Sequence, residues 1–385
     1  MDRKILIFGN FPFNSTSEFI DTNHFANYFA SIGDNVDFVT PPAYVPDFCL
    51  FFLKNRLSTL KNYLHSSIQI RDNLFQYTPL SFLPIRNNSI LGSKFNTKLF
   101  SLGFKSTSLS RKNYDICITS QGFMLIWSQY VNAKLFIYRY NDIIDGFKDN
   151  PPILNEYENT FVKYKSPIIL AVNQRLAEYL HKKYPENKNI KILPNGVDID
   201  FFKNAKPDEE LIKIKKKKLV FCGGVDFWVD TDLLYETARR LTDSILIIIG
   251  PSYTNIDKLL SLPNVVYLGP KKYEQIPSLL KACDIGLIPF KKNRLTEFVE
   301  KPLKYYEYLA AGLMVISTGL AHTTEKNPYF KNCRDPQLFI ETIEKTEVMK
   351  VTDRWKISST VNENDWKSIF SELELIITNC LESCK

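Results

Sequence analysis

The sequence predicts an α/β fold with two doubly wound, Rossmann-like domains, each built on a largely parallel sheet. Short apolar runs of strand length alternate with amphipathic segments of helix length along most of the chain, which is the pattern of repeated βαβ units. The chain has 385 residues, which is long for one hydrophobic core and favours two domains. We expect these domains over residues 1–205 and 206–365, with a terminal helix in residues 366–385.

The chain opens with a βαβ unit. Residues 4–8 form an apolar run of strand length, Phe25, Phe29 and Ile32 have helical spacing, and residues 36–39 form a second strand. The loop after the first strand lacks the G-x-G-x-x-G pattern of dinucleotide-binding domains. The first domain therefore does not have the sequence of a dehydrogenase cofactor domain.

A basic segment of weaker periodicity follows. Residues 54–112 contain ten Lys and Arg residues and a single acid, Asp72. We expect helices over residues 51–64 and 95–104 and a strand over residues 74–77. The net charge of +7 is concentrated in this half of the chain, because residues 1–205 hold 23 Lys and Arg against 17 Asp and Glu.

Basic side chains interleaved with Phe and Leu can bind anionic lipid headgroups or a diphosphate-linked substrate, although a solvated basic face has the same pattern. The sequence shows no helix-turn-helix, zinc-finger or RNP-type pattern that would indicate a nucleic-acid partner. The candidate acceptor or membrane patch consists of Lys54, Arg56, Lys61, Arg86, Lys94 and Lys98.

Regular alternation then brings an aspartate to the end of a strand. We expect strands over residues 115–118, 135–138 and 168–171, and helices over residues 123–130, 155–164 and 174–182. The phrase YRYNDIIDG places Asp142 in the loop after the second of these strands, with Asp145 as the alternative. Carboxyl ends of parallel strands face the ligand crevice of an open sheet, where a carboxylate can act as a general base. An aspartate that caps a turn has the same local sequence.

The second domain follows a charged linker over residues 206–218. Its expected strands cover residues 219–222, 245–249, 265–268 and 285–288, and its first helices residues 233–241 and 275–283. Gly223 and Gly224 follow the first strand, where backbone N–H groups without a nearby Cβ can approach a phosphate. An ordinary tight turn would also contain such a pair. Phe290 follows Pro289 just after the fourth strand, where an aromatic side chain can line a nucleobase slot.

The stretch EKPLKYYEYLAAGLMVIST, residues 300–318, combines a short helix with a buried strand. Pro302 suits the first helical position and Gly312 the left-handed position after the helix. Lys304 lies in the first turn, with Glu307 three residues later. A lysine at a helix N-terminus can hold a diphosphate, and a carboxylate can accept hydrogen bonds from a ribose cis-diol. A solvated Lys/Glu pair is the alternative.

The segment PLKYYEYLAAG resembles the donor site of GT-B glycosyltransferases, particularly bacterial family 4 enzymes with a PLK-x-x-E-Y-L-A-A-G signature. GGVDFWVD and ILPNGVD also resemble segments of that family, and NDWKSIF resembles its terminal helix, which crosses back to the first domain. The resemblance implies a nucleotide-sugar donor, most simply UDP-linked. Its implied ligands are Gly223, Gly224, Phe290, Lys304 and Glu307.

The first domain resembles a narrower group. The Y-R-x-x-D pattern at Asp142 is similar to that of xanthan-type glucuronosyltransferases, in which the aspartate deprotonates the acceptor hydroxyl. This similarity implies glucuronic acid as the donor sugar and a glycan or lipid-diphosphate-linked oligosaccharide as the acceptor. It also implies a role in polysaccharide biosynthesis.

Two departures from the family pattern affect the mechanism. Retaining enzymes use an E-x7-E pair, but Val299 occupies the position of the first glutamate before Glu307. The basic residues that usually follow the glycine turn are also missing, so the diphosphate would rely on Lys304, helix N-termini or Arg294. These departures favour inversion, with a retaining enzyme that uses another donor as the alternative.

We expect no metal or other cofactor. Asp198 and Asp200 form a D-x-D pattern but follow a turn glycine, so we interpret them as structural. The seven cysteines are scattered without a C-x-x-C, which suits reduced thiols in a cytoplasmic protein. No secretory signal or bilayer-spanning run is visible, so any contact with the inner face of a membrane would be peripheral.

Two other classes of protein fit parts of the sequence. A UDP-sugar 2-epimerase-like isomerase shares the two-domain shape but needs no basic, aromatic acceptor surface. A non-catalytic nucleotide-sugar-binding or membrane-docking protein would not need Asp142. Dependence of UDP release on an added acceptor separates the transferase from the epimerase.

Overall fold

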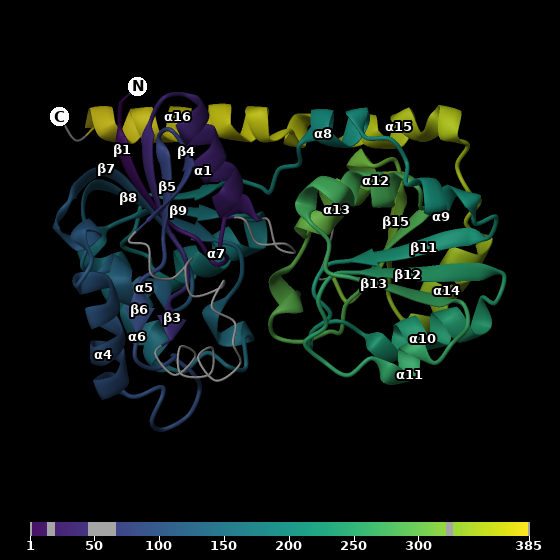
Figure 1. Ribbon diagram of the computed structural model, residues 1–385, viewed down its shortest axis with the longest axis horizontal. Coiled ribbons are helices and arrows are strands. Elements are labelled where there is room, and N and C mark those ends of the chain that lie inside the picture. Colours follow the sequence, from purple (N-terminus) through teal and green to yellow (C-terminus); the bar gives the residue numbers. More distant parts are fainter. Residues whose placement is uncertain (1, 14–19, 45–66, 321–325, 384–385) are drawn as a thin grey trace. The chain divides into compact units, whose positions relative to one another are not determined.

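The computed structural model describes residues 2–13, 20–44, 67–320 and 326–383. The helix expected over residues 51–64, with Lys54, Arg56 and Lys61, lies outside these ranges. The chain divides into two compact units (Figure 1). Unit 1 comprises Met1–Ser15, Phe19–Leu193 and Glu374–Lys385, and unit 2 comprises Thr16–Glu18 and Pro194–Leu373.

Unit 1 is built on an eight-stranded sheet in the order β10-β9-β8-β7-β1-β2-β5-β4. All neighbouring pairs are parallel except β4 with β5. The inner strands are largely apolar and buried because helices cover the sheet, as in Ile5 to Phe8 of β1, which are all 0% exposed. The strands are β1 (Lys4–Phe8), β2 (Asn35–Val39), β4 (Ile68–Arg71), β5 (Leu74–Tyr77), β7 (Asn113–Ser120), β8 (Asn132–Tyr140), β9 (Ile168–Ala171) and β10 (Ile190–Ile192). A separate two-stranded sheet joins β3 (Ala43–Tyr44) to β6 (Leu80–Ser81).

The helices of unit 1 pack on this sheet through aromatic side chains. Trp127 stacks on Phe100 at 4.9 Å and on Phe104 at 5.8 Å between ring centroids. The Trp127 Nε1–H also donates to the Phe100 carbonyl at 2.9 Å, which satisfies the buried indole. The helices are α1 (Asp21–Ser31), α4 (Lys94–Lys105), α5 (Met124–Ser128), α6 (Ile153–Lys165) and α7 (Gln174–Lys183), with 3₁₀ turns η1 (Ser108–Arg111) and η2 (Ile144–Gly146).

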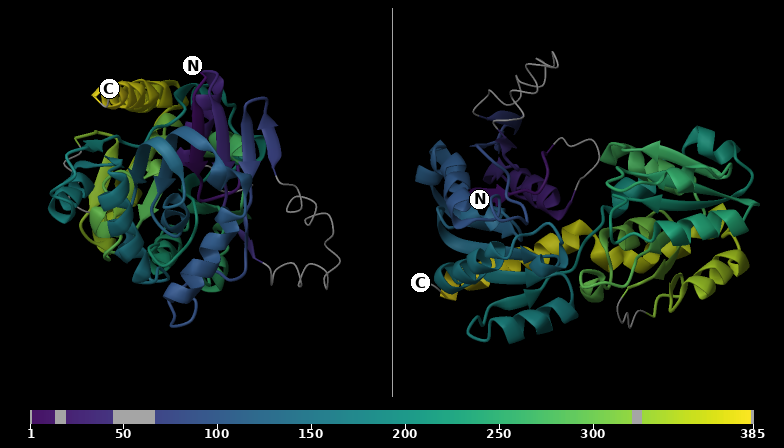
Figure 2. Two further views of the ribbon diagram at one scale, coloured as in Figure 1. Left: turned by 90° about the vertical axis from the view of Figure 1, so that its left-hand side faces the viewer. Right: turned by 90° about the horizontal axis from the view of Figure 1, so that it is seen from below.

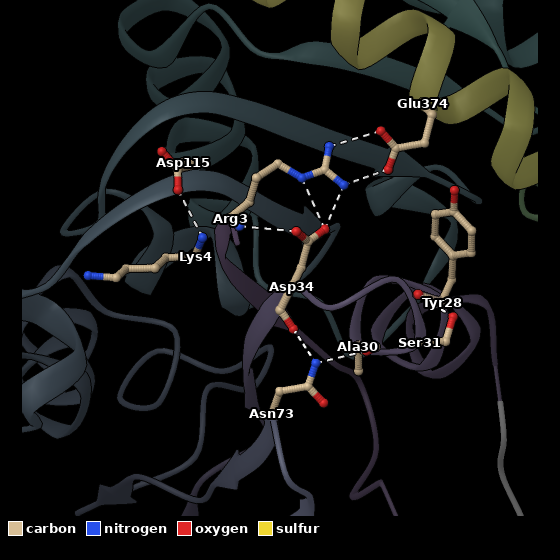
Figure 3. A network of polar contacts seen from close by, with 9 residues as sticks. All are labelled: Arg3, Lys4, Tyr28, Ala30, Ser31, Asp34, Asn73, Asp115 and Glu374. Carbon is tan, nitrogen blue, oxygen red and sulfur yellow. Dashed lines mark hydrogen bonds and ion pairs between the residues drawn. The ribbon is translucent and has the colours of Figure 1, made fainter. Parts of the chain in front are cut away.

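The terminal helix α16 (Trp366–Ser383) passes from unit 2 into unit 1. Its Glu374 carboxylate accepts two hydrogen bonds from the Arg3 guanidinium, at 2.6 and 2.9 Å (Figure 3). The same guanidinium binds the buried Asp34 carboxylate at 2.6 Å, and Asn73 donates to the Asp34 carbonyl. These contacts tie the middle of α16 to Arg3, directly before β1, and to the turn between α1 and β2.

Unit 2 contains a six-stranded parallel sheet in the order β13-β12-β11-β14-β15-β16. The strand order reverses between β11 and β14, so the ligand crevice of this sheet is expected at the carboxyl ends of these two strands. The strands are β11 (Lys217–Cys222), β12 (Ser244–Ile249), β13 (Val265–Gly269), β14 (Ile285–Pro289), β15 (Met314–Thr318) and β16 (Phe330–Cys333).

Helices flank both faces of this sheet. Figure 1 shows α10 and α11 on one side and α12 and α13 on the other, and Figure 2 gives two further views of the same layers. The helices are α8 (Ile199–Asn204), α9 (Glu209–Lys213), α10 (Thr231–Arg240), α11 (Asp257–Leu260), α12 (Ile276–Lys281), α13 (Leu303–Ala310), α14 (Pro336–Lys345) and α15 (Arg354–Ser358), with 3₁₀ turns η3 (Tyr273–Gln275), η4 (Thr296–Phe298), η5 (Val351–Asp353) and η6 (Ser359–Asn364).

The predicted α/β class with parallel sheets is confirmed, and local differences have physical reasons. Pro302 is the residue before α13 rather than its first residue, because its ψ of 162° is extended. Gly312 has the expected left-handed φ of 80°. The segment expected as a solvated linker contains α9, whose Leu211 is buried in the core of unit 2, and the start of β11.

Candidate functional site

A glycine turn follows the end of β11 in unit 2. Gly223 has a φ of 137°, a conformation that other residues rarely adopt. A Cβ on Gly223 would lie 3.2 Å from both Cε and Nζ of Lys304. Glycine at this position therefore permits the turn and also leaves space for the lysine head group.

Lys304 lies in the first turn of α13 and reaches across to the two central strands. Its Nζ lies 5.2 Å from the ring centroid of Phe221 and 4.9 Å from that of Phe290. Phe290 is only 6% exposed, so its ring supports the lysine from within the core. The ammonium is thus held by aromatic faces at the switch point of the sheet.

Lys304 and Glu307 have unusual electrostatics for a helix surface. Burial lowers the pKa of Lys304, while the neighbouring Cys222 thiol and Glu307 carboxyl oppose that shift. Burial raises the pKa of Glu307 to about 7, although the Lys304 charge opposes it. Within the ranges that the structure describes, neither side chain forms a hydrogen bond or an ion pair of its own. Their polar atoms therefore have unused capacity for a ligand.

Tyr253 is a residue of this region that the sequence interpretation did not include. It follows β12, and a Cβ on Gly224 would lie 3.2 Å from its Cε2 atom. Its side chain is 59% exposed, so an aromatic face stands beside the glycine turn. Its position in the loop that follows the carboxyl end of β12, the neighbour of β11, was a signal that could have identified it.

Arg294 and Val299 lie in the connection between β14 and α13. The Arg294 guanidinium forms an ion pair with Glu297 at 3.3 Å and packs over the Phe298 ring at 4.9 Å. Val299 packs against the hydrophobic core of unit 2. The structure therefore brings Lys304 to the glycine turn, and places Arg294 against residues of its own loop.

Asp142 lies just after β8 in unit 1 and is half-buried. The Gln121 amide fixes its backbone, since the amide oxygen accepts from the Asp142 N–H at 3.0 Å and the amide nitrogen donates to the Arg139 carbonyl at 3.2 Å. No described residue donates a hydrogen bond to its carboxylate. Burial, and secondly the negative charge of Asp21, raise the pKa of Asp142 to about 6. Such a carboxylate can accept a proton near neutral pH.

The other carboxylates near this strand end have different roles. Asp21 is 1% exposed, and its carboxylate pairs with the buried Arg139 at 2.8 Å and accepts from the Asn141 amide at 3.0 Å. Asp145 is exposed on the 3₁₀ turn η2. Asp21 therefore has a structural role as the partner of Arg139. Asp142 is partly buried, and its carboxylate accepts no hydrogen bond from a described residue.

The described part of the basic patch centres on α4, at the periphery of unit 1 (Figures 1 and 2). Arg86, Lys94 and Lys98 are exposed, and Lys94 pairs with Glu156 at 3.0 Å. Large apolar side chains are exposed beside them: Phe82 at 56%, Ile90 at 70%, Phe95 at 72% and Leu102 at 47%. Among the described residues, no helix has the length and apolar character needed to cross a bilayer.

The D-x-D pair has local partners. Asp198 accepts from the Phe201 N–H at 3.0 Å and caps the N-terminus of α8. Asp200 pairs with Lys367 of α16 at 2.5 Å. Both contacts agree with the structural interpretation of these residues.

Comparison with known proteins defines the class. Residues 216–346 match the family model described as glycosyl transferases group 1. The fold is that of sucrose-phosphate synthase from Thermosynechococcus elongatus, with a TM-score of 0.72 and 11% identity over 99% of this chain and 100% of that chain. The Anabaena protein Alr3699/HepE, solved with UDP and glucose, gives a TM-score of 0.65 and 13% identity over 98% and 100% of the two chains. The chain is a glycosyltransferase with the GT-B fold.

One curated relative extends the likeness beyond the second domain. The chain is 27% identical over 306 residues to a protein of Bacillus subtilis (strain 168) that carries the name "Putative teichuronic acid biosynthesis glycosyltransferase TuaH". The match covers 72% of this chain and 76% of the relative.

Proposed function

We propose that the protein transfers a sugar from a UDP-sugar to a hydroxyl of a glycan or lipid-linked oligosaccharide during polysaccharide biosynthesis. The arrangement of Lys304 against Gly223, with Glu307 on the next turn of α13, is the observation that carries the proposal. It offers a cation and backbone N–H groups to a diphosphate and a carboxyl group to a ribose. The HepE structure with UDP and glucose, and the name of TuaH, support the donor and the process.

The proposed chemistry is direct displacement at the anomeric carbon. Asp142 takes the proton from the acceptor hydroxyl as its oxygen forms the new glycosidic bond, and the bond from the anomeric carbon to UDP breaks. Lys304 stabilises the negative charge that develops on the departing diphosphate. Val299 in place of a glutamate supports the inverting outcome. NMR of the product distinguishes it from the retaining alternative through the anomeric configuration.

Donor binding is tested by thermal shift with a panel of UDP-sugars, including UDP-glucuronic acid. A ligand at 100 times its Kd stabilises the folded protein by about 2.7 kcal/mol. Lys304→Ala should weaken UDP binding about 10- to 100-fold because it removes a charge-assisted contact. Lys345→Ala, at an exposed lysine of α14, is the matched control and should bind normally. Equal UDP affinity in the unmodified protein, Lys304→Ala and Lys345→Ala would refute the role of Lys304 in donor binding.

Turnover separates the transferase from its rival. UDP release should require an added acceptor, whereas an epimerase would convert its UDP-sugar without one. We expect activity to persist after treatment with EDTA, since the proposal uses Lys304 and backbone N–H groups for the diphosphate. Loss of activity on chelation, restored by a divalent cation, would contradict that part of the proposal.

The exposed face of α4 supports a peripheral membrane partner on the cytoplasmic side. Phe95, Lys98, Leu102 and Lys105 follow one another at helical spacing and are all exposed. Apolar and basic side chains on one face suit the headgroup region of an anionic bilayer. This face is the part of the basic patch that the structure describes, and it would bring the enzyme to a lipid-linked acceptor.

A further inference from the structure

The two central strands of unit 2 separate before they end. Strand β11 pairs with β12 up to Cys222, opposite Ile249. Its described pairing with β14 covers only Leu219 with Ile285 and Val220 with Gly286, although β14 continues to Pro289. The Cys222 N–H, which faces away from β12, therefore has no strand carbonyl on its β14 side and needs another acceptor.

A buried tyrosine hydroxyl occupies that gap. Tyr308 of α13 is 0% exposed, and its hydroxyl accepts from the Cys222 N–H at 2.7 Å. The same hydroxyl donates to the Leu287 carbonyl of β14 at 3.4 Å. It thus bridges the two strands where their own pairing has stopped.

Gly286 makes this arrangement possible. A Cβ at residue 286 would lie 2.3 Å from Cδ2 and 2.4 Å from Cγ of the Tyr308 ring. The ring therefore lies directly on the β14 backbone. A glycine on one strand and a tyrosine on the covering helix together form a wedge at the switch point of the sheet.

The wedge joins the two parts of the candidate donor site. Cys222 directly precedes Gly223, and Tyr308 directly follows Glu307 and lies one helical turn from Lys304. We propose that Tyr308 is a positioning residue that fixes the separation between α13 and the glycine turn, and so sets donor affinity. The proposal rests on the proposed function, because it assumes that this site binds the UDP moiety.

The test compares donor binding and turnover in Tyr308→Phe with the unmodified protein. Removal of one oxygen leaves the Cys222 N–H without its acceptor, and we expect the UDP Kd and the donor KM to rise about tenfold. We expect kcat at saturating donor and the acceptor KM to change less than about threefold, because Tyr308 is fully buried in unit 2 and the proposed base, Asp142, belongs to unit 1. Gly286→Ala displaces the same ring and should raise the donor KM in the same way.

Ile343→Val is the stability control. Ile343 is 0% exposed in α14, and its truncation lowers the stability of the core by about 1 kcal/mol without contact with the wedge. Its UDP affinity should remain that of the unmodified protein. An equal loss of affinity in Ile343→Val would assign the effect to general stability and overturn the positioning role.

The remaining outcomes separate the two proposals. Absence of UDP binding by the unmodified protein would refute the proposed function. UDP binding that is equally tight in the unmodified protein and Tyr308→Phe would refute only the role of Tyr308. If Tyr308→Phe does not fold, an unchanged donor KM in Gly286→Ala would refute it instead.

Discussion

At the scale of single residues, unit 1 places two carboxyl groups in different environments at one sheet edge. Asp21 has its charge satisfied by Arg139 and by hydrogen bonds from Asn141 and Thr22. The negative charge of Asp21 contributes to the raised pKa of Asp142. Among the described residues, none donates a hydrogen bond to the Asp142 carboxylate. This contrast in environment is how proteins assign structural and proton-transfer roles to neighbouring carboxyl groups.

Asp142→Asn should lower turnover by about two to four orders of magnitude, as expected for loss of a general base. The pKa of Asp142 is raised to about 6, and the ionised form is the active base. The rate of the unmodified enzyme should therefore be full above this pH and fall as the pH drops through about 6. Initial rates of UDP release across the pH range check both expectations.

The exposed Asp149 provides the control for this prediction, since Asp149→Asn removes a nearby charge and should leave the rate unchanged. Full turnover in Asp142→Asn, and again in the double variant with Asp145→Asn, would show that neither aspartate is the base.

Glu307 makes donor binding depend on pH. Burial raises the pKa of Glu307 to about 7, and only the ionised carboxylate accepts two hydrogen bonds from a ribose. Affinity for UDP-glucose should therefore increase as the pH rises through about 7, while the diphosphate diester itself stays ionised. Calorimetry at pH 6 and pH 8 measures the change. Glu307→Gln should bind more weakly with no such increase, and a persisting pH dependence would exclude Glu307 as its source.

The sequence identified residues of this kind only where a motif marks them. Lys304 and Glu307 stand in a recognisable helix start, and Asp142 follows a clear strand. Tyr308 lies in the same motif, but no role was predicted for it, because its role depends on where the pairing between β11 and β14 stops. Asp21 likewise acquires its importance from Arg139, which lies 118 positions away in the chain.

At the scale of elements, the ends of helices and strands in unit 2 depend on glycines in the left-handed region. Gly312 follows α13 with a φ of 80°, and a Cβ there would lie 2.8 Å from Cβ of Arg354. Gly269 is the last residue of β13, has a φ of 67° and has no atom within 4 Å of the position that a Cβ would occupy. A side chain at either position would have to adopt a left-handed backbone conformation, but only at Gly312 would its Cβ also collide with a neighbouring residue.

Gly269→Ala should therefore lower the free energy of unfolding by about 1 kcal/mol, the cost of a left-handed alanine. Gly312→Ala should lower it by about 2 to 4 kcal/mol, because overpacking against Arg354 adds to that strain. Denaturant unfolding of both variants gives the difference. If both variants lose the same free energy of unfolding, Arg354 moves away at no cost and the left-handed φ alone determines the loss.

Most elements were predictable because their apolar runs are short and bounded by turn residues. The strands at residues 4–8, 74–77 and 168–171 have the predicted limits. Periodicity did not reveal the edge strands β4 and β16, because each has two exposed polar side chains among its four residues, which weakens the apolar signal. Helix ends differed where capping decided them, as at Pro302.

At the scale of the whole molecule, α16 is the element that belongs to both units. Glu374→Ala removes the two hydrogen bonds from Arg3 and leaves a partly buried cation with Asp34 alone. We expect a loss of about 1.5 to 3 kcal/mol in the stability of unit 1. Thermal unfolding measures it, and Glu372→Ala at an exposed position of the same helix is the control. A midpoint equal to that of the control would show that other contacts hold α16 in place.

The basic and apolar face of α4 predicts how the whole protein meets a membrane. Co-sedimentation with phosphatidylglycerol vesicles should be strong at low salt and weak at 1 M salt, where screening shortens to about 3 Å. The double variant Lys98→Gln and Lys105→Gln should bind about thirtyfold more weakly, since each lysine near an anionic surface contributes about 1 kcal/mol. Lys345→Gln in unit 2 should bind normally. Tight binding to neutral phosphatidylcholine, or none to anionic vesicles at low salt, would show that this face does not bind anionic lipid.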